Sequence, residues 1–203
     1  MTLKASLPRL LLASTSPRRK QILESLNLPF LIVNPQGDEA LAHAGNVEEV
    51  TMANSLLKAQ SGVSLAVKDS DIVIGSDTLV ILGQEVMSKP QSREQAIRML
   101  TQLSGNWHRV VTGLALVSKH YGELKTFDTS KIKFKALTPQ EIENYAATKE
   151  PYDKAGSYAV QGLGALLIDK IEGSYTNVMG FPVEKFLTEL SLFTKISLKE
   201  WFS

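Results

Sequence analysis

The 203-residue sequence contains no cysteine, which excludes a disulfide scaffold, a thiolate zinc site and a cysteine nucleophile. It also lacks any apolar stretch close to the ~20 residues that a membrane-spanning helix needs. The apolar run near the N-terminus is interrupted by Pro8 and Arg9 and is too short for the core of a signal peptide. We therefore expect a cytoplasmic protein with no membrane partner, and the missing cysteines fit a reducing compartment.

A surplus of charge of one sign is likewise absent. Lysine and arginine number 22, aspartate and glutamate number 21, and the net charge is +1. Without a broad basic field the chain is not expected to bind nucleic acid, and any anion site must be local. Histidine is scarce, and His43, His108 and His120 show no metal-ligand spacing. We interpret them as loop or strand-surface residues, which argues against a metal hydrolase built on histidine ligands.

The composition that remains is that of an ordinary globular protein, with 43% hydrophobic and 21% charged residues. Strand-like and helix-like segments alternate, and two strand pairs look like hairpins. This pattern predicts an α/β fold with a mixed β-sheet flanked by helices, in a single domain over residues 1–203 with two lobes about a cleft. The expected strands are 10–13, 30–33, 71–82, 85–87, 107–118, 123–135 and 165–171. The expected helices are 16–26, 47–60, 92–103, 138–148 and 182–192.

Local signals support several of these helices. Ser92 is a good N-cap, and Thr138-Pro139-Gln140-Glu141 combines a capping box with proline in the first helical turn. In the helix predicted over 47–60, apolar spacing predicts that Val47, Val50 and Leu57 face inward.

The segment Ser14-Thr15-Ser16-Pro17-Arg18-Arg19 joins the first predicted strand to the first predicted helix. Unpaired N–H groups make a helix start partly positive, so acidic residues are the stabilising choice there. Two arginines in the first turn are unfavourable by a few tenths of a kcal/mol each, unless an anion such as phosphate binds. A solvated helix start whose arginines pair with distant acids would also explain the pattern, and the motif alone leaves both interpretations open.

Asp77 interrupts the apolar run of the strand predicted over 71–82. An isolated carboxylate buried there would lose several kcal/mol of hydration. It therefore needs a metal ion, a cation or a role in a reaction. The alternative is a structural acid that accepts hydrogen bonds from backbone N–H groups at a strand end.

Two lysines and one loop complete the candidate features. Lys58 lies late in a predicted helix and Lys89 precedes Pro90, although a lone lysine is usually a solvated surface charge. The segment 153–164 contains three glycines and Gln161, whose primary amide can donate to and accept from a nucleobase edge. Loops of this kind carry function more often than buried elements do, but a plain glycine-rich connection would have the same pattern.

In this order, these segments resemble the Maf family of nucleoside triphosphate pyrophosphatases. The resemblance spans nearly the whole chain, and the joint order and spacing of its motifs are highly specific. It implies a mixed-sheet α/β fold of the inosine-triphosphatase-like type with a cleft between lobes, a divalent metal and a homodimer. The matching segments are 12–19, 58–59, 75–78, 88–90, 103–105, 154–158, 161–162 and 173–182.

The resemblance also implies a substrate branch and a general base. Arg18, Thr78 and Gln161 match the branch similar to the dTTP/UTP pyrophosphatases, and Asp77 matches the family's proposed general base. The branch that acts on 7-methyl-GTP has tryptophan in place of Arg18 and Ser-Glu-Gly in place of 160–162, so this chain does not resemble it.

The implied reaction is water attack at the α-phosphorus of a nucleoside triphosphate, which releases nucleoside monophosphate and pyrophosphate. Mg²⁺ or Mn²⁺ would be held through Asp77 and Glu39, with Asp38 as the neighbouring alternative to Glu39. The sequence leaves open whether Asp77 acts as the base, as a metal ligand or as both. Gln161 and Thr78 would help to select the pyrimidine. The triphosphate would be held by the cations Arg18, Arg19, Lys58 and Lys89 and by the hydroxyl and N–H groups of Ser14 and Ser16.

Two other functions remain open from the sequence. One is a non-catalytic nucleotide-binding regulator of cell division, which would need no general base. The other is a phosphatase that removes single phosphates. The products separate the three possibilities, because only a pyrophosphatase releases pyrophosphate.

Overall fold

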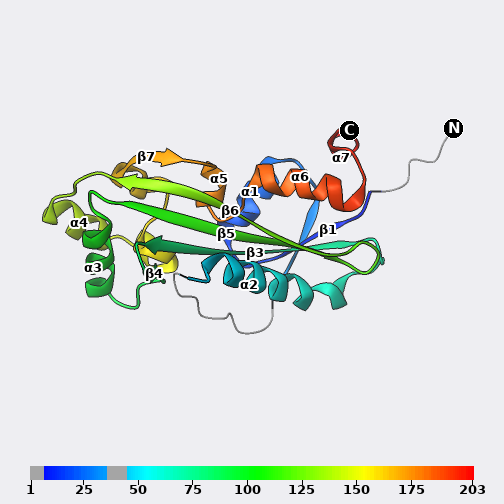
Figure 1. The fold of residues 1–203 in the computed structure, drawn as a ribbon, viewed down its shortest axis with the longest axis horizontal. Coiled ribbons are helices and arrows are strands. Elements are labelled where there is room, and N and C mark those ends of the chain that lie inside the picture. Colours follow the sequence, from blue (N-terminus) through cyan, green and yellow to red (C-terminus); the bar gives the residue numbers. More distant parts are fainter. Residues whose placement is uncertain (1–6, 36–44) are drawn as a thin grey trace.

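The computed structural model describes residues 7–35 and 45–203, in which one mixed sheet is the central element (Figure 1). Its strand order is β2-β1-β3-β5-β6-β7, with β4 paired to β3 beside this path. β1 pairs in parallel with β2 and β3, and all other pairings are antiparallel. The strands are β1 (Leu10–Ala13), β2 (Phe30–Val33), β3 (Ile72–Leu82), β4 (Glu85–Met87), β5 (Trp107–Ser118), β6 (Gly122–Phe134) and β7 (Ile168–Glu172).

Helices cover both faces of the sheet, with α2 on one side and α1 and α6 on the other (Figure 1). The predicted fold class, a mixed sheet flanked by helices, is therefore confirmed. None of the described helices is long and apolar enough to cross a bilayer. In the part of the chain that the structure describes, the helices are α1 (Pro17–Ser25), α2 (Val47–Ser61), α3 (Arg93–Leu103), α4 (Pro139–Ala146), α5 (Tyr175–Val178), α6 (Val183–Thr194) and α7 (Leu198–Trp201). The short 3-10 turns described are η1 (Val63–Leu65), η2 (Glu150–Asp153), η3 (Ala155–Ser157) and η4 (Gly162–Leu167).

Strand alternation divides the core between the two faces. Leu10 and Leu12 of β1 pack in the cluster that includes α1 and α6, whereas Leu11 and Ala13 pack in the cluster that includes Ala59 of α2. Successive side chains of a strand point to opposite faces, so a fully apolar strand such as β1 is covered on both sides.

α2 approaches the sheet unusually closely because two glycines lie beneath it. A Cβ atom at Gly75 of β3 would lie 1.9 Å from the Ser55 carbonyl oxygen, and one at Gly113 of β5 would lie 2.2 Å from the Thr51 carbonyl oxygen. Only a residue without a side chain fits at either position. This contact fixes the height and rotation of α2 above the middle of β3.

The close approach also explains an error in the predicted orientation of α2. Leu57 was expected to face inward, but it is 48% exposed. The buried face instead carries the small and polar residues Thr51, Asn54 and Ser55, together with Val47 and Val50 as predicted. A helix that lies directly on glycines has no room for a leucine beneath it.

Local capping signals predicted helix starts well. Ser92 accepts a hydrogen bond from the Gln95 N–H, and the capping box of Thr138 and Glu141 is complete. The β3–β4 hairpin is also confirmed, with Gly83 in the left-handed region at φ 58°. The remaining differences are short elements: residues 165–167, predicted as the start of a strand, belong to η4, and α5 and α7 were not predicted.

Candidate active site

A cleft of about 830 Å³ opens beside the middle of β3. Its walls come from the β1–α1 turn, α2, β3, the end of β4, the segment 153–160 and the loop at 178–180. Elements far apart in the sequence therefore meet at one place. The predicted site residues that line the cleft are Ser14, Ser16, Arg18, Arg19, Lys58, Asp77, Thr78 and Lys89.

The β1–α1 turn brings a helix start to the cleft. Ser16 occupies the N-cap position of α1, yet its side chain makes no capping hydrogen bond, and the first turn contains no acid. The backbone N–H of Ser16 donates to Ser14 Oγ at 3.1 Å. The predicted helix start with two arginines in its first turn is thus present, and because no side chain caps it, its N–H groups favour an anion.

The two arginines of this turn have different partners. Arg18 forms an ion pair with Asp153 at 3.6 Å, so a link to a distant acid exists for this residue. Arg19 donates to the Gly180 carbonyl oxygen at 2.9 Å, and to Ser14 Oγ and Thr78 Oγ1 at 3.2 Å each. Arg19 thereby joins α1 to β3 and to the loop before α6.

Asp77 is buried, 5% exposed, at the floor of the cleft. Its Oδ1 accepts from Lys58 Nζ at 2.7 Å, and its Oδ2 accepts from Asn54 Nδ2 at 3.1 Å. Lys58 also donates to the Ser76 carbonyl oxygen at 3.3 Å. The cation that a buried carboxylate needs is therefore supplied by α2, and the pair faces the cleft.

Asn54 is a site residue that the sequence analysis missed. It lies one helical turn before Lys58, and residues four apart share a helix face. This spacing is the sequence signal that places Asn54 beside Lys58. Lys154 also lines the cleft and was not singled out; its Nζ donates to the Glu150 carbonyl oxygen at 2.7 Å and to Asp153.

The hydroxyl of Thr78 lies in a chain of hydrogen bonds. Thr78 Oγ1 is 3.1 Å from Thr112 Oγ1, which in turn donates to the Asn177 carbonyl oxygen at 2.9 Å. Ser76 Oγ donates to the Gly180 carbonyl oxygen at 3.0 Å. These bonds hold the loop around residue 180 against β3 and so define one side of the cleft.

Among the described residues that were predicted for the site, one does not line the cleft. Tyr158, Ala159 and Val160 line it, but Gln161, the next residue, is half-buried and does not. Glu39, with its neighbour Asp38, lies outside the described residues.

The oxygen donors at the floor fit a divalent metal that is shared with a substrate. Within residues 7–35 and 45–203 no cluster of three or more acids or histidines could hold a metal alone. Mg²⁺ in nucleotide sites is commonly held by one or two carboxylates together with substrate phosphates. Asp77 has the chemistry of such a carboxylate.

The prediction for one histidine was wrong. His108 was expected at a loop or strand surface, but it is 2% exposed on β5, and its Nε2 lies 2.7 Å from the Tyr158 hydroxyl oxygen. Burial lowers its pKa to about 4, so the ring is neutral at pH 7. Tyr158 lines the cleft, and His108 therefore supports the cleft wall from behind. His120 is exposed, as expected, and His43 lies outside the described residues.

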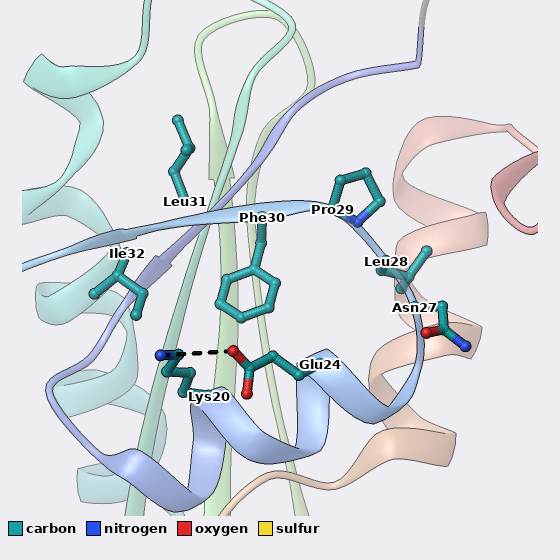
Figure 2. Close-up of a pocket in the computed structure, with 8 residues that line it drawn as sticks. All are labelled: Lys20, Glu24, Asn27, Leu28, Pro29, Phe30, Leu31 and Ile32. Atoms are coloured by element: carbon teal, nitrogen blue, oxygen red, sulfur yellow. Dashed lines mark ion pairs between the residues drawn. The ribbon is translucent and has the colours of Figure 1, made fainter.

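A second hollow of about 580 Å³ lies between α1 and β2 (Figure 2). Its lining is mostly apolar, and the one cation among its described lining residues, Lys20, pairs with Glu24 at 3.5 Å. It lacks the convergent cations of the cleft, so the cleft is the candidate active site.

Comparison with known proteins identifies the family of this chain. The family model described as Maf-like protein matches residues 9–193. A dTTP/UTP pyrophosphatase of Desulforamulus reducens is 39% identical over 185 residues, which cover 91% of this chain and 96% of that protein. A dTTP/UTP pyrophosphatase of Vibrio parahaemolyticus is 45% identical over 174 residues, which cover 86% of this chain and 91% of that protein.

Among solved structures, the Ham1 protein of Staphylococcus aureus covers 92% of this chain and 98% of its own, with a TM-score of 0.51. At 14% sequence identity this likeness shows the fold alone. The family match and the relatives at about 40% identity extend over nearly the whole chain, and together they show that the chain belongs to the Maf family.

Proposed function

We propose that this chain hydrolyses dTTP and UTP to the nucleoside monophosphate and pyrophosphate. The observation that carries the proposal is the buried Asp77 carboxylate, paired with Lys58, at the floor of a cleft with further cations in its walls. Relatives named dTTP/UTP pyrophosphatase support the choice of substrate.

Pyrophosphate is a good leaving group, so catalysis consists mainly of positioning and of charge neutralisation. Arg18 and Lys89 would bind the phosphate chain from two sides of the cleft. Lys58 would face the developing charge, and the N–H groups at the start of α1 would add donors. Arg19 would keep Ser14 and Thr78 in place.

Asp77 would orient the attacking water at the α-phosphorus and accept its proton. Each carboxylate oxygen keeps acceptor capacity beyond its bond to Lys58 or Asn54. We propose Asp77 also as the protein ligand of Mg²⁺ or Mn²⁺, together with Glu39. The bound ion would neutralise phosphate charge and lower the pKa of a coordinated water.

The test is product analysis with a panel of nucleotides. Purified protein with Mg²⁺ or Mn²⁺ should release pyrophosphate from dTTP and UTP, and a chelator should abolish this release. Asp77→Asn should lower turnover by at least ~10²-fold. The exposed Asp169→Asn serves as the control and should remain active. Release of orthophosphate would indicate a phosphatase, and no product would indicate a nucleotide-binding regulator.

We also propose that the chain is a cytoplasmic homodimer, as the resemblance to the Maf family implies. Sedimentation velocity at micromolar concentration should give a species of twice the chain mass. A monomer over the whole concentration range would contradict the proposed homodimer but would not bear on the proposed reaction.

A further inference from the structure

The cleft wall at residues 158–164, here called the wall segment, is held at one end by Tyr145 and at the other by Glu150, and these two side chains bond to each other. Its first residues, Tyr158, Ala159 and Val160, line the cleft. Gln161 follows, and the chain then turns at Gly162, whose φ is 65°. The position of Gln161 relative to a bound base therefore depends on what fixes the ends of this segment.

The far end of the wall segment is bound by the carboxylate of Glu150 in η2. Glu150 Oε1 accepts from the Gly164 N–H at 2.8 Å, and Oε2 accepts from the Leu163 N–H at 3.2 Å. Successive N–H groups after a left-handed residue form a concave site for an anion. Here the chain's own carboxylate fills that site.

The near end is bound by Tyr145 of α4. Its hydroxyl accepts from the Ala159 N–H at 3.2 Å and donates to Glu150 Oε1 at 2.9 Å. Tyr145 is 5% exposed, and burial raises the pKa of its hydroxyl, which therefore stays a donor at neutral pH. The two side chains form one connected unit that holds three backbone N–H groups.

The packing leaves little freedom around this unit. A Cβ atom at Gly162 would lie 2.6 Å from Glu150 Oε2. One at Gly164 would lie 2.2 Å from the Ala159 carbonyl oxygen and 2.8 Å from the Tyr145 hydroxyl oxygen. Glycine at both places lets the wall segment fold tightly against the Tyr145–Glu150 pair.

We propose that Glu150 and Tyr145 are positioning residues that set the wall segment, and with it Gln161, for pyrimidine selection. The inference rests on the proposed function and on the role in pyrimidine selection that the family resemblance implies for Gln161, which follows the cleft-lining residues but does not itself line the cleft. Neither residue lines the cleft, so each acts through the backbone it holds. The phosphate chemistry is assigned to β3, α2, the start of α1 and Lys89 after β4. Loosening the wall segment should therefore change base preference more than turnover.

The experiment compares Glu150→Gln and Tyr145→Phe with Glu143→Gln. Glu143 is an acid on α4 that pairs with Arg93 at the surface and does not touch the wall segment, so it is a matched control. We expect both test variants to lower the preference for dTTP over dCTP in kcat/KM by about tenfold, with kcat for dTTP changed by less than about twofold. The control should keep the wild-type preference.

Repeating the comparison in a Gln161→Ala variant shows whether Glu150 affects the base preference through Gln161. In Gln161→Ala, adding Glu150→Gln should cause no further loss of preference, because residues that act as a unit are not additive. An equal loss in both backgrounds would overturn the inference. If Glu150→Gln does not fold, Tyr145→Phe, which removes only a hydroxyl, carries the same comparison.

Amide hydrogen exchange separates this inference from the proposed function. In Glu150→Gln, exchange at Leu163 and Gly164 should become at least about tenfold faster relative to amides of β5. Unchanged exchange overturns the positioning role even for an inactive protein. A wild type that releases no pyrophosphate refutes the proposed function, whereas an active wild type whose variants keep their preference refutes this inference alone.

Discussion

At the scale of single residues, the buried Asp77–Lys58 pair carries the largest electrostatic consequence. Both side chains are mostly buried, with 7% and 13% exposed, and Asn54 donates a second hydrogen bond to the carboxylate. A buried pair adds little net stability, but removal of one partner leaves an uncompensated charge. The pair therefore makes both residues hard to replace, independently of their role in turnover.

Lys58→Met tests this dependence. The methionine keeps the length of the side chain but removes the charge, so we expect the free energy of unfolding to fall by about 3 kcal/mol at pH 7. Urea denaturation measures the change. Lys119→Met, at an exposed lysine, should differ from wild type by less than about 0.5 kcal/mol. Equal stability of the two variants would show that Asp77 is not dependent on its cation.

His108 should make the folded state sensitive to moderate acid. Burial lowers its pKa from 6.5 to about 4. Between these two pH values the unfolded chain binds a proton at this histidine, whereas the folded chain does not. The free energy of unfolding should therefore fall between pH 6.5 and 4, by up to about 3 kcal/mol. Denaturation curves at several pH values measure this slope.

The control for this slope is another histidine. His108→Gln should lose the decline between pH 6.5 and 4, while the variant of exposed His120, His120→Gln, should keep it. Asp71 contributes in a separate window, because its hydrogen bond with Arg9 lowers its pKa from 3.8 to about 2, and its stabilisation is lost only as pH falls through that range. A slope that persists in His108→Gln would contradict the assignment.

At the scale of elements, the contact of α2 with the sheet connects stability to the site. α2 carries both partners of Asp77, and its height is set by Gly75 and Gly113. A shift of the helix away from the sheet would move Asn54 and Lys58 together. Packing and chemistry are thus coupled through one helix.

Gly113→Ala should reveal this coupling. The added Cβ would lie 2.2 Å from the Thr51 carbonyl oxygen, so α2 must move. We expect a loss of about 2 to 3 kcal/mol in the free energy of unfolding, together with lower turnover of dTTP. Gly122→Ala is the control, since that position is open although its φ is 86°, and it should cost only about 1 kcal/mol with normal turnover. Normal turnover of Gly113→Ala would show that the packing of α2 on the sheet does not control the active site.

At the scale of the whole molecule, charge is concentrated rather than abundant. The net charge is +1, yet the cleft contains Arg18, Arg19, Lys58, Lys89 and Lys154 against Asp77 and Asp153. A cleft lined mainly by one sign of charge raises the local concentration of an oppositely charged ligand. The field is therefore local to the cleft, where a triphosphate would bind.

Salt should weaken nucleotide binding through this field. The Debye length falls from about 10 Å at 0.1 M salt to about 3 Å at 1 M, so KM for dTTP should rise several-fold over that range while kcat changes little. Lys89→Met should flatten the dependence, and Lys119→Met, far along the chain at the β5–β6 turn, should keep it. A KM that does not change with salt would contradict electrostatic capture.

Short-range signals account for what could be predicted from the sequence. The capping residues Ser92 and Thr138, the Gly83 hairpin and the apolar run of β1 each depend on neighbours within a few residues. The arginines at the start of α1 and the carboxylate in β3 marked two parts of the site for the same reason, since each conflicts with its local surroundings. Such conflicts are expected at functional sites.

The sequence by itself thus determined the α/β class, most element boundaries, and the fact that Asp77 needs a partner. Only the tertiary structure decided which partner it has, that Leu57 is exposed and His108 buried, and that Glu150 and Tyr145 hold the wall segment. The physical reason is that burial and hydrogen bonding depend on segments that are distant in the chain and adjacent in space. Residues 54 and 77, or 145 and 159, meet only once the sheet has formed and its helices have packed against it.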